Sequence, residues 1–181
     1  QFQNWVNVGA SGLIWGGLEV KGNKVKVALR FYDVVSQREL LLRNYEENLE
    51  SADRAIRKFL DEVIELLTGE PGVFSSRLVY VKRTPHGKAI YISDIDGRNA
   101  RRLTPPDVLS LLPAWSPSGR HILFTSYLKN NPDLYRLTLS TGKLEWLSNK
   151  RGLNTGAAVS PDGKRIALTL SIDGNTEIYV C

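Results

Sequence analysis

The sequence predicts an α/β N-terminal module followed by an all-β region that forms part of a β-propeller. Three observations support this fold class. An apolar stripe predicts one long helix between residues 51 and 69, and a 44-residue repeat fills the second half of the chain. The charge balance also changes: residues 1–75 carry 9 Lys and Arg against 11 Asp and Glu, whereas residues 76–181 carry 15 against 8. We therefore expect two regions of different character.

The first region begins with predicted β-strands. Residues 24–32 alternate between apolar and polar side chains, as in a strand with one buried face. The apolar set is Val25, Val27, Leu29 and Phe31. Gly22-Asn23 before this segment and Ser36-Gln37 after it are typical of turns. We therefore expect two or three adjacent strands between residues 13 and 45.

A helix follows these strands. Its apolar residues recur at steps of three and four: Ala55, Ile56, Phe59, Leu60, Val63, Ile64 and Leu67. Ser51 is placed to cap its N-terminus, Gly69 supplies a left-handed stop, and Pro71 prevents continuation. The acidic residues Asp61, Glu62 and Glu65 are open to two readings, paired catalytic carboxylates or a solvated helix face. We favour the solvated face.

The second region is a repeat with a period of 44 residues. The segment AWSPSGRHILFT begins at Ala114, and AVSPDGKRIALT begins at Ala158. Each contains a Ser-Pro-x-Gly turn, in which proline sets the first central residue and glycine takes the left-handed position that returns the chain as a hairpin. A fixed period of about 40–45 residues with several short strands per unit is typical of β-propeller blades.

The blades are predicted at residues 77–104, 112–147 and 156–181. In the middle blade we expect strands at 112–115, 121–127, 134–139 and 143–147; the first blade has no innermost strand and the third has no outermost one. Ten strands do not close a propeller, which needs about four to eight blades of four. We therefore expect a fragment, or a chain completed by a partner, that self-associates through its unpaired strand edges.

Catalysis is not supported by any motif in the sequence. A propeller of this kind also resembles the gate domain of a prolyl-oligopeptidase-like serine hydrolase, which needs a Gly-x-Ser-x-Gly nucleophile turn with acid and histidine partners. The segment GASGL at residues 9–13 breaks that spacing. The two histidines, His86 and His121, are expected in a loop and beside a turn. We expect no enzymatic activity and no cofactor.

Metal, nucleic-acid and membrane binding are also not expected. Asp94 and Asp96 resemble the start of a calcium loop, but its twelfth position is Pro105 where glutamate is required, which favours a turn stabilised by aspartates. Cys181 is the single cysteine. The basic residues of the second region are spread as pairs, which favours solvated positions over a nucleic-acid-binding face. No stretch is apolar and long enough for direct membrane insertion.

The chain resembles the TolB family of the Tol-Pal envelope system. The resemblance lies in LTGEPGVFSSRLVYV at residues 67–81 and in the blade segments PAWSPSG and AAVSPDGKRIALTLSIDGNTEIYV. It implies that residues 1–72 are the C-terminal part of an N-terminal α/β domain. It also implies that residues 77–181 are about two and a half to three blades of a six-bladed propeller. The family's signal peptide, its TolA-contacting segment and about half of its propeller have no counterpart here.

The resemblance further implies a non-catalytic periplasmic scaffold. Such a protein binds the peptidoglycan-associated lipoprotein Pal through its propeller and communicates with TolA or other inner-membrane Tol proteins, in support of outer-membrane integrity and cell division. The expected Pal-binding residues lie just before the innermost strand of two blades: Leu109, Ser110, Leu111, Leu153, Asn154 and Thr155. Leu153 stands where familiar members often have a polar residue such as histidine. Because other blades furnish much of the docking ring, we expect the intact parent protein to bind Pal and the fragment alone to bind it weakly or not at all.

Overall fold

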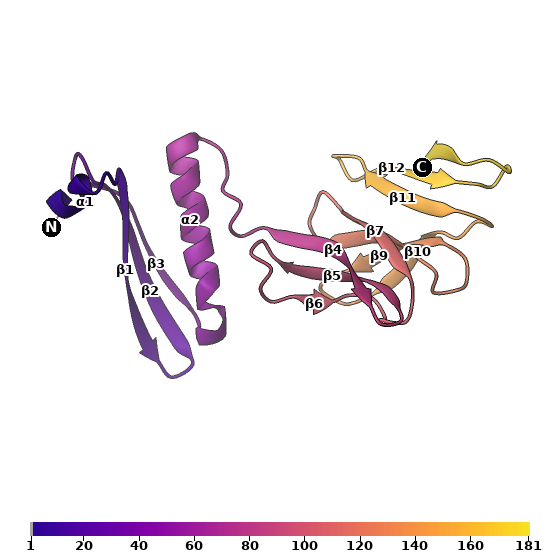
Figure 1. The fold of residues 1–181 in the computed structure, drawn as a ribbon, viewed down its shortest axis with the longest axis horizontal. Coiled ribbons are helices and arrows are strands. Elements are labelled where there is room, and N and C mark those ends of the chain that lie inside the picture. The colour runs from indigo at the N-terminus through magenta and orange to yellow at the C-terminus, as the bar shows by residue number, and fades with distance from the viewer. Residues whose placement is uncertain (1) are drawn as a thin grey trace. The chain divides into compact units, whose positions relative to one another are not determined.

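The chain folds into two compact units, of which the first ends at Ser76 and the second begins at Arg77. The structure is a computed structural model that describes residues 2–181. Within that range the protein is mostly β, with 13 strands in four small sheets and two α-helices (Figure 1). No helix among the described residues is long and apolar enough to cross a membrane.

The first unit contains one antiparallel sheet of three strands in the order β1-β2-β3. Its elements are α1 (Phe2–Asn7), β1 (Gly12–Lys21), β2 (Lys24–Asp33), β3 (Arg38–Asn48), the 3-10 turn η1 (Leu49–Ser51) and α2 (Ala52–Thr68). The β1–β2 turn falls at Gly22 and Asn23, and the β2–β3 turn contains Ser36 and Gln37, at the positions that the turn sequences indicate.

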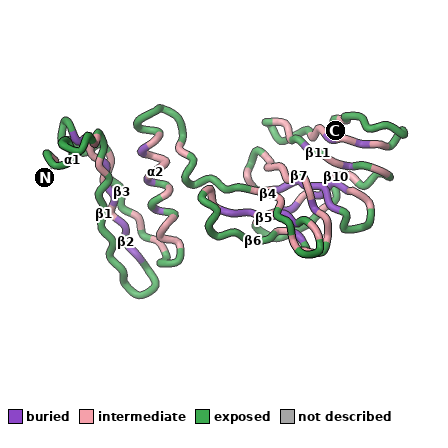
Figure 2. Tube along the Cα trace, viewed as in Figure 1, coloured by how far each residue is buried: buried purple, intermediate pink, exposed green. Residues whose placement is uncertain are grey.

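The core of this unit lies between α2 and the alternating apolar face of β2. Val25, Val27, Leu29 and Phe31 are all buried, and they pack with a buried stripe of α2 made of Ala55, Phe59 and Val63 (Figure 2). The helix contacts β2 and β3. Apolar residues of β1 that pair with this buried face stay exposed: Ile14, Leu18 and Val20.

The two ends of α2 are held differently. At its C-terminus Gly69 has a φ of 77° and its N–H donates to the carbonyl of Glu65 at 2.8 Å, which is the predicted left-handed stop. At its N-terminus Ser51 occupies the capping position, but the expected side-chain cap is absent. Its hydroxyl donates instead to the carbonyl of Asn48 at 3.2 Å, because η1 precedes the helix and brings that carbonyl within reach.

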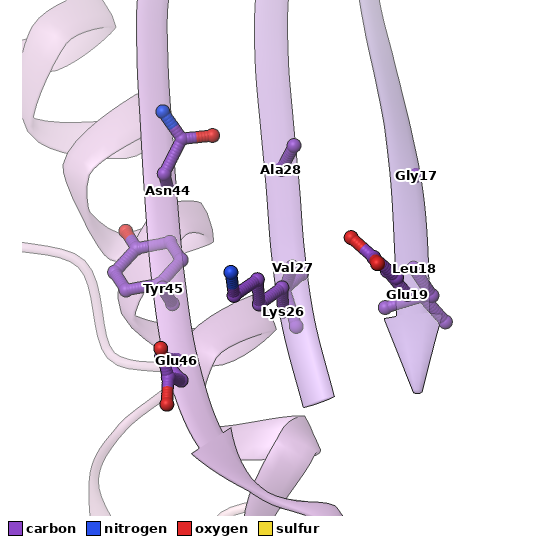
Figure 3. A pocket seen from close by; sticks show the side chains of 9 residues that line it. All are labelled: Gly17, Leu18, Glu19, Lys26, Val27, Ala28, Asn44, Tyr45 and Glu46. Carbon is purple, nitrogen blue, oxygen red and sulfur yellow. The ribbon is translucent and has the colours of Figure 1, made fainter. Parts of the chain in front are cut away.

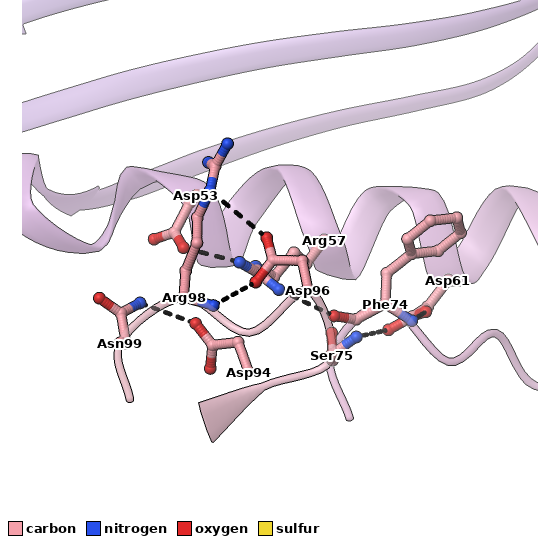
Figure 4. A network of polar contacts seen from close by, with 9 residues as sticks. All are labelled: Asp53, Arg57, Asp61, Phe74, Ser75, Asp94, Asp96, Arg98 and Asn99. Carbon is pink, nitrogen blue, oxygen red and sulfur yellow. Dashed lines mark hydrogen bonds and ion pairs between the residues drawn. The ribbon is translucent and has the colours of Figure 1, made fainter. Parts of the chain in front are cut away.

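Asp61, on the acidic face of α2, anchors the segment that follows the helix. Its two carboxylate oxygens accept hydrogen bonds from the N–H groups of Phe74 at 2.6 Å and Ser75 at 2.9 Å (Figure 4). A side chain at Gly72 would clash with Asp61. Two of the three acidic residues predicted on the solvated face therefore have structural partners within their own unit, since Glu62 accepts a hydrogen bond from Arg43 at 2.6 Å.

The second unit consists of three antiparallel sheets of the blade type. Their strands are β4 (Arg77–Thr84), β5 (Gly87–Asp94) and β6 (Arg101–Arg102); β7 (Ser110–Trp115), β8 (His121–Ser126), β9 (Asp133–Thr138) and β10 (Leu144–Ser148); and β11 (Asn154–Val159), β12 (Ile166–Leu170) and β13 (Glu177–Val180). One apolar cluster joins the first and second sheets, and another joins the second and third. The sheets are thus packed face to face.

The innermost strands begin two residues earlier than the sequence predicts. β7 starts at Ser110, where residue 112 was expected, and β11 starts at Asn154, where residue 156 was expected. Both strands contain an irregularity at the same repeat position, where Leu112 has a φ of 50° and Gly156 a φ of 66°. This left-handed residue interrupts the alternation of side chains along the strand. The sequence pattern therefore does not assign the first two residues to the strand.

Candidate protein-interaction surface

The connections of the second unit fall at two ends of the sheets because neighbouring strands are antiparallel. One end, called here the loop face, carries residues 85–86, 103–109, 127–132, 149–153 and 171–176. The other end, called the turn face, carries residues 95–100, 116–120, 139–143 and 160–165. The predicted site residues belong to the loop face or to the strand residues that enter it.

The six predicted residues differ in how far they reach the surface. Ser110 and Asn154 are fully buried. Leu109, Leu111 and Thr155 are half-buried, and Leu153 is 36% exposed. The structure therefore divides the set into residues that support the loops and residues that a partner is able to touch.

Asn154 organises the loop that joins β10 to β11. Its amide nitrogen donates to the carbonyls of Pro132 at 3.2 Å, Lys150 at 2.6 Å and Gly152 at 3.0 Å. Its amide oxygen accepts from the hydroxyl of Ser148 at 2.6 Å and from the N–H of Lys150 at 2.9 Å. A buried amide with every site satisfied fixes a loop conformation, so Asn154 shapes this face from beneath.

The neighbouring blade uses smaller groups at the same repeat position. The hydroxyl of Ser110 lies 3.0 Å from that of Ser126 in a fully buried pair. The hydroxyl of Thr125 reaches across to the third sheet, donating to Thr155 Oγ1 at 3.0 Å and lying 3.3 Å from the carbonyl of Asn154. These contacts fix the spacing of two adjacent blades at the loop face.

The loop face also contains exposed apolar residues that the sequence analysis missed. Tyr127 is 37% exposed and Leu128 is 36% exposed in one loop, and Ile172 is 44% exposed in the next. Leu128 and Ile172 are 44 residues apart, so they occupy the same position of the repeat. Together with Leu153 they form an apolar group on this face, of the kind found at the centres of protein interfaces.

A repeated backbone contact ties these loops together. The N–H of Tyr127 donates to the carbonyl of Leu109 at 3.0 Å, and the N–H of Ser171 donates to the carbonyl of Leu153 at 3.3 Å. The Ser171 hydroxyl also accepts from the Leu153 N–H at 2.9 Å. In each of these two adjacent blades, the two connections on the loop face are therefore hydrogen-bonded to each other.

The candidate catalytic and metal-binding residues of the sequence analysis lie on different elements of the second unit. His86 lies on the loop face and His121 begins β8 at the turn face, so the two histidines are at opposite ends. Asp94 accepts from the Asn99 amide at 2.7 Å, and Asp96 accepts from the Arg98 N–H at 3.0 Å within the same turn (Figure 4). Among residues 2–181 no group of three or more side chains is arranged to hold a metal ion.

The first unit carries a shallow hollow of about 560 Å³ on the sheet face away from α2 (Figure 3). Lys26 on the central strand pairs in register with Glu19 on one side and Glu46 on the other. Glu46 also accepts from Lys24 at 2.9 Å, and this hydrogen bond holds the pKa of Glu46 below its usual value. The hollow therefore has a lysine on its central strand with a glutamate opposite it on each neighbouring strand, so charges of both signs line it.

Repeated antiparallel blades around shared apolar interfaces define a protein of the β-propeller class. The model of the TolB beta propeller domain matches residues 64–181, which is more than half of the chain. The chain belongs to the TolB family.

Named relatives and one solved structure agree with this assignment. The chain is 38% identical over 178 residues to the Tol-Pal system protein TolB of Desulfosudis oleivorans, covering 98% of the chain and 40% of the relative. It is 34% identical to a TolB homolog of Chlorobaculum tepidum, covering 99% and 41%. The crystal structure of TolB from Acinetobacter baumannii superposes with a TM-score of 0.91 at 32% identity, covering 99% of this chain and 46% of that one. The chain thus spans less than half the length of these proteins.

Proposed function

We propose that this chain acts in a non-catalytic periplasmic scaffold of the Tol-Pal system that binds the lipoprotein Pal. The proposal is supported by relatives that are named as Tol-Pal system proteins and by the exposed apolar group of the loop face. In this assignment residues 1–72 belong to an N-terminal α/β domain that communicates with TolA or other inner-membrane Tol proteins. Residues 77–181 contribute about two and a half to three blades of a six-bladed propeller.

The proposal rests mainly on one observation: buried polar residues hold the loops of the loop face, and apolar residues of the same loops are exposed. Asn154 and Ser110 are buried and hold the loops, whereas Leu128, Leu153 and Ile172 project apolar surface from the same loops. Apolar side chains displayed by a rigid framework lose little conformational freedom on binding, which favours association with a protein. This arrangement has no acid, base or nucleophile in a matched set, so it supports binding in preference to catalysis.

Calorimetry with the soluble domain of Pal tests this proposal. The full-length natural protein that contains this chain is compared with a variant carrying Leu128→Ser and Leu153→Ser. Because burying a leucine contributes about 1.5–3 kcal/mol, we expect the Kd to rise at least about tenfold. The matched control carries Leu78→Ser and Leu144→Ser, which alter leucines of similar exposure away from the loop face. An unchanged Kd for the loop-face variant, or an equal loss in the control, would show that the site is wrong.

A further inference from the structure

A second concave surface lies on the turn face, at the opposite end of the sheets from the loop face. It is a pocket of about 530 Å³ between the first two sheets of the second unit. Its lining residues come from β4, from β6 and from two adjacent turns: Arg77, Arg101, Gly119, Arg120, Leu139 and Ser140. The two turns are joined by a hydrogen bond from the Leu139 N–H to the Arg120 carbonyl at 3.0 Å. The pocket is therefore built by connected elements of one unit.

The charged residues that line this pocket are all positive. Three arginines line it, and no aspartate or glutamate is among the lining residues. Among residues 2–181 no ion pair involves Arg77, Arg101 or Arg120. Like charges gathered at one concave surface raise the local potential and attract an anionic group.

The neighbouring groove shows that this arrangement is not a general property of the turn face. A pocket of about 470 Å³ lies between the second and third sheets and contains His121 and Arg136, but it also contains Asp162. Arg136 is moreover paired with Glu145 at 2.9 Å. The groove between the second and third sheets is balanced in charge, whereas the one between the first and second is not.

One of the three arginines is held in place before any ligand arrives. The Arg77 guanidinium lies 5.3 Å from the centre of the Trp115 ring, a cation–π contact that limits its motion. Leu139 adds an apolar wall to the pocket. A preorganised guanidinium beside apolar surface suits a carboxylate on a protein segment, because the fork of donors pairs with the carboxylate and the wall contacts the adjoining chain.

We propose that this arginine pocket binds an acidic segment of a protein partner. Its size exceeds what a single small anion fills, and the whole region from residue 76 to residue 181 carries 15 basic against 8 acidic residues, which complements an acidic chain. The site does not rest on the Pal proposal. It lies at the other end of the sheets, so either proposal can fail without the other.

Fluorescence anisotropy with a fluorescein-labelled peptide of six glutamates tests the proposal on the full chain at 20 mM and at about 150 mM NaCl. The test variant carries Arg101→Gln and Arg120→Gln, which are exposed and leave the Arg77–Trp115 contact intact. The matched control carries Lys150→Gln and Arg151→Gln, which remove the same charge from the loop face. We expect the test variant to raise the Kd at least about tenfold and the control less than about twofold, with weaker binding at higher salt.

A variant with Arg101→Lys and Arg120→Lys keeps the charge but loses the guanidinium fork, so we expect an intermediate Kd. It also keeps the test informative if the glutamine variant unfolds by circular dichroism. Equal losses in the test and control variants would show nonspecific attraction and overturn the proposal. So would binding to phosphatidylglycerol vesicles or to inorganic phosphate without binding to the peptide, because the ligand would then be a phosphate group.

Discussion

Replacing Asn154 with alanine is the substitution for which the structure gives the sharpest expectation. The side chain is fully buried and takes part in five hydrogen bonds with distances of 2.6–3.2 Å. Two of them go to Lys150, an exposed residue whose carbonyl also accepts from the Asn131 amide at 3.0 Å and so keeps a partner after the truncation. The other three involve Ser148, Pro132 and Gly152. At about 1 kcal/mol each, their loss lowers the free energy of unfolding of the second unit by about 3 kcal/mol.

Urea denaturation followed by tryptophan fluorescence measures this effect. With a slope of about 2 kcal/mol per molar urea, the midpoint of the second unit moves down by about 1.5 M. Asn149→Ala is the matched control, since Asn149 lies in the same loop but is exposed, and we expect a change below about 0.5 kcal/mol. A loss under about 1 kcal/mol for Asn154→Ala, or equal losses in the two variants, would refute the assignment of Asn154 as the residue that fixes the loop.

Three further predictions concern local conformation and pH. Leu112→Gly raises the thermal midpoint, since leucine at a φ of 50° costs about 1 kcal/mol and Gly156 fills the equivalent position; an unchanged or lower midpoint contradicts this. Gly152→Ala lowers the thermal midpoint by several degrees, because its φ is 89° and a Cβ would clash with the Ser171 hydroxyl; unchanged melting contradicts the clash. Burial foremost, and then the nearby Glu62 charge, raise the pKa of Tyr45 to about 12. The neutral phenol therefore stabilises the fold below pH 10, and this contribution is lost as the pH rises from 10 to 12. In an ultraviolet titration of tyrosine ionisation, we expect Tyr45→Phe to remove one ionisation step that occurs above pH 10. Ionisation of every tyrosine near pH 10 would contradict this prediction.

The sequence predicted best where a periodic apolar pattern coincides with one buried face. Val25, Val27, Leu29 and Phe31 are buried as their alternation indicates, and the stripe of α2 supplies the residues that cover them. The 44-residue repeat likewise indicated the antiparallel strands of the second unit, because each copy repeats the same turns. These patterns reflect burial, which dominates the energetics of folding.

The site was harder to predict from the sequence because some of its polar residues are buried and some of its apolar residues are exposed. Asn154 and Ser110 look in the sequence like residues that face a partner, since isolated polar residues are usually exposed. The structure buries both, because the Lys150 carbonyl accepts from Asn154 and the Ser126 hydroxyl on β8 pairs with Ser110. Leu128 and Ile172 were missed for the opposite reason: apolar residues beside strands are normally assigned to the core. Only the pairing of loops from separate strands reveals which of these side chains lie outside.

The most direct test of the proposed Pal-binding function is a hydrogen-exchange footprint of the Pal soluble domain on the full-length natural protein. We expect slower amide exchange on complex formation in residues 127–132, 149–153 and 171–176, since these loops present the apolar group of the loop face. The turns at residues 116–120 and 160–165 are expected to exchange at the same rate with and without Pal. Protection confined to those turns, or none in the loop-face segments, would contradict the account.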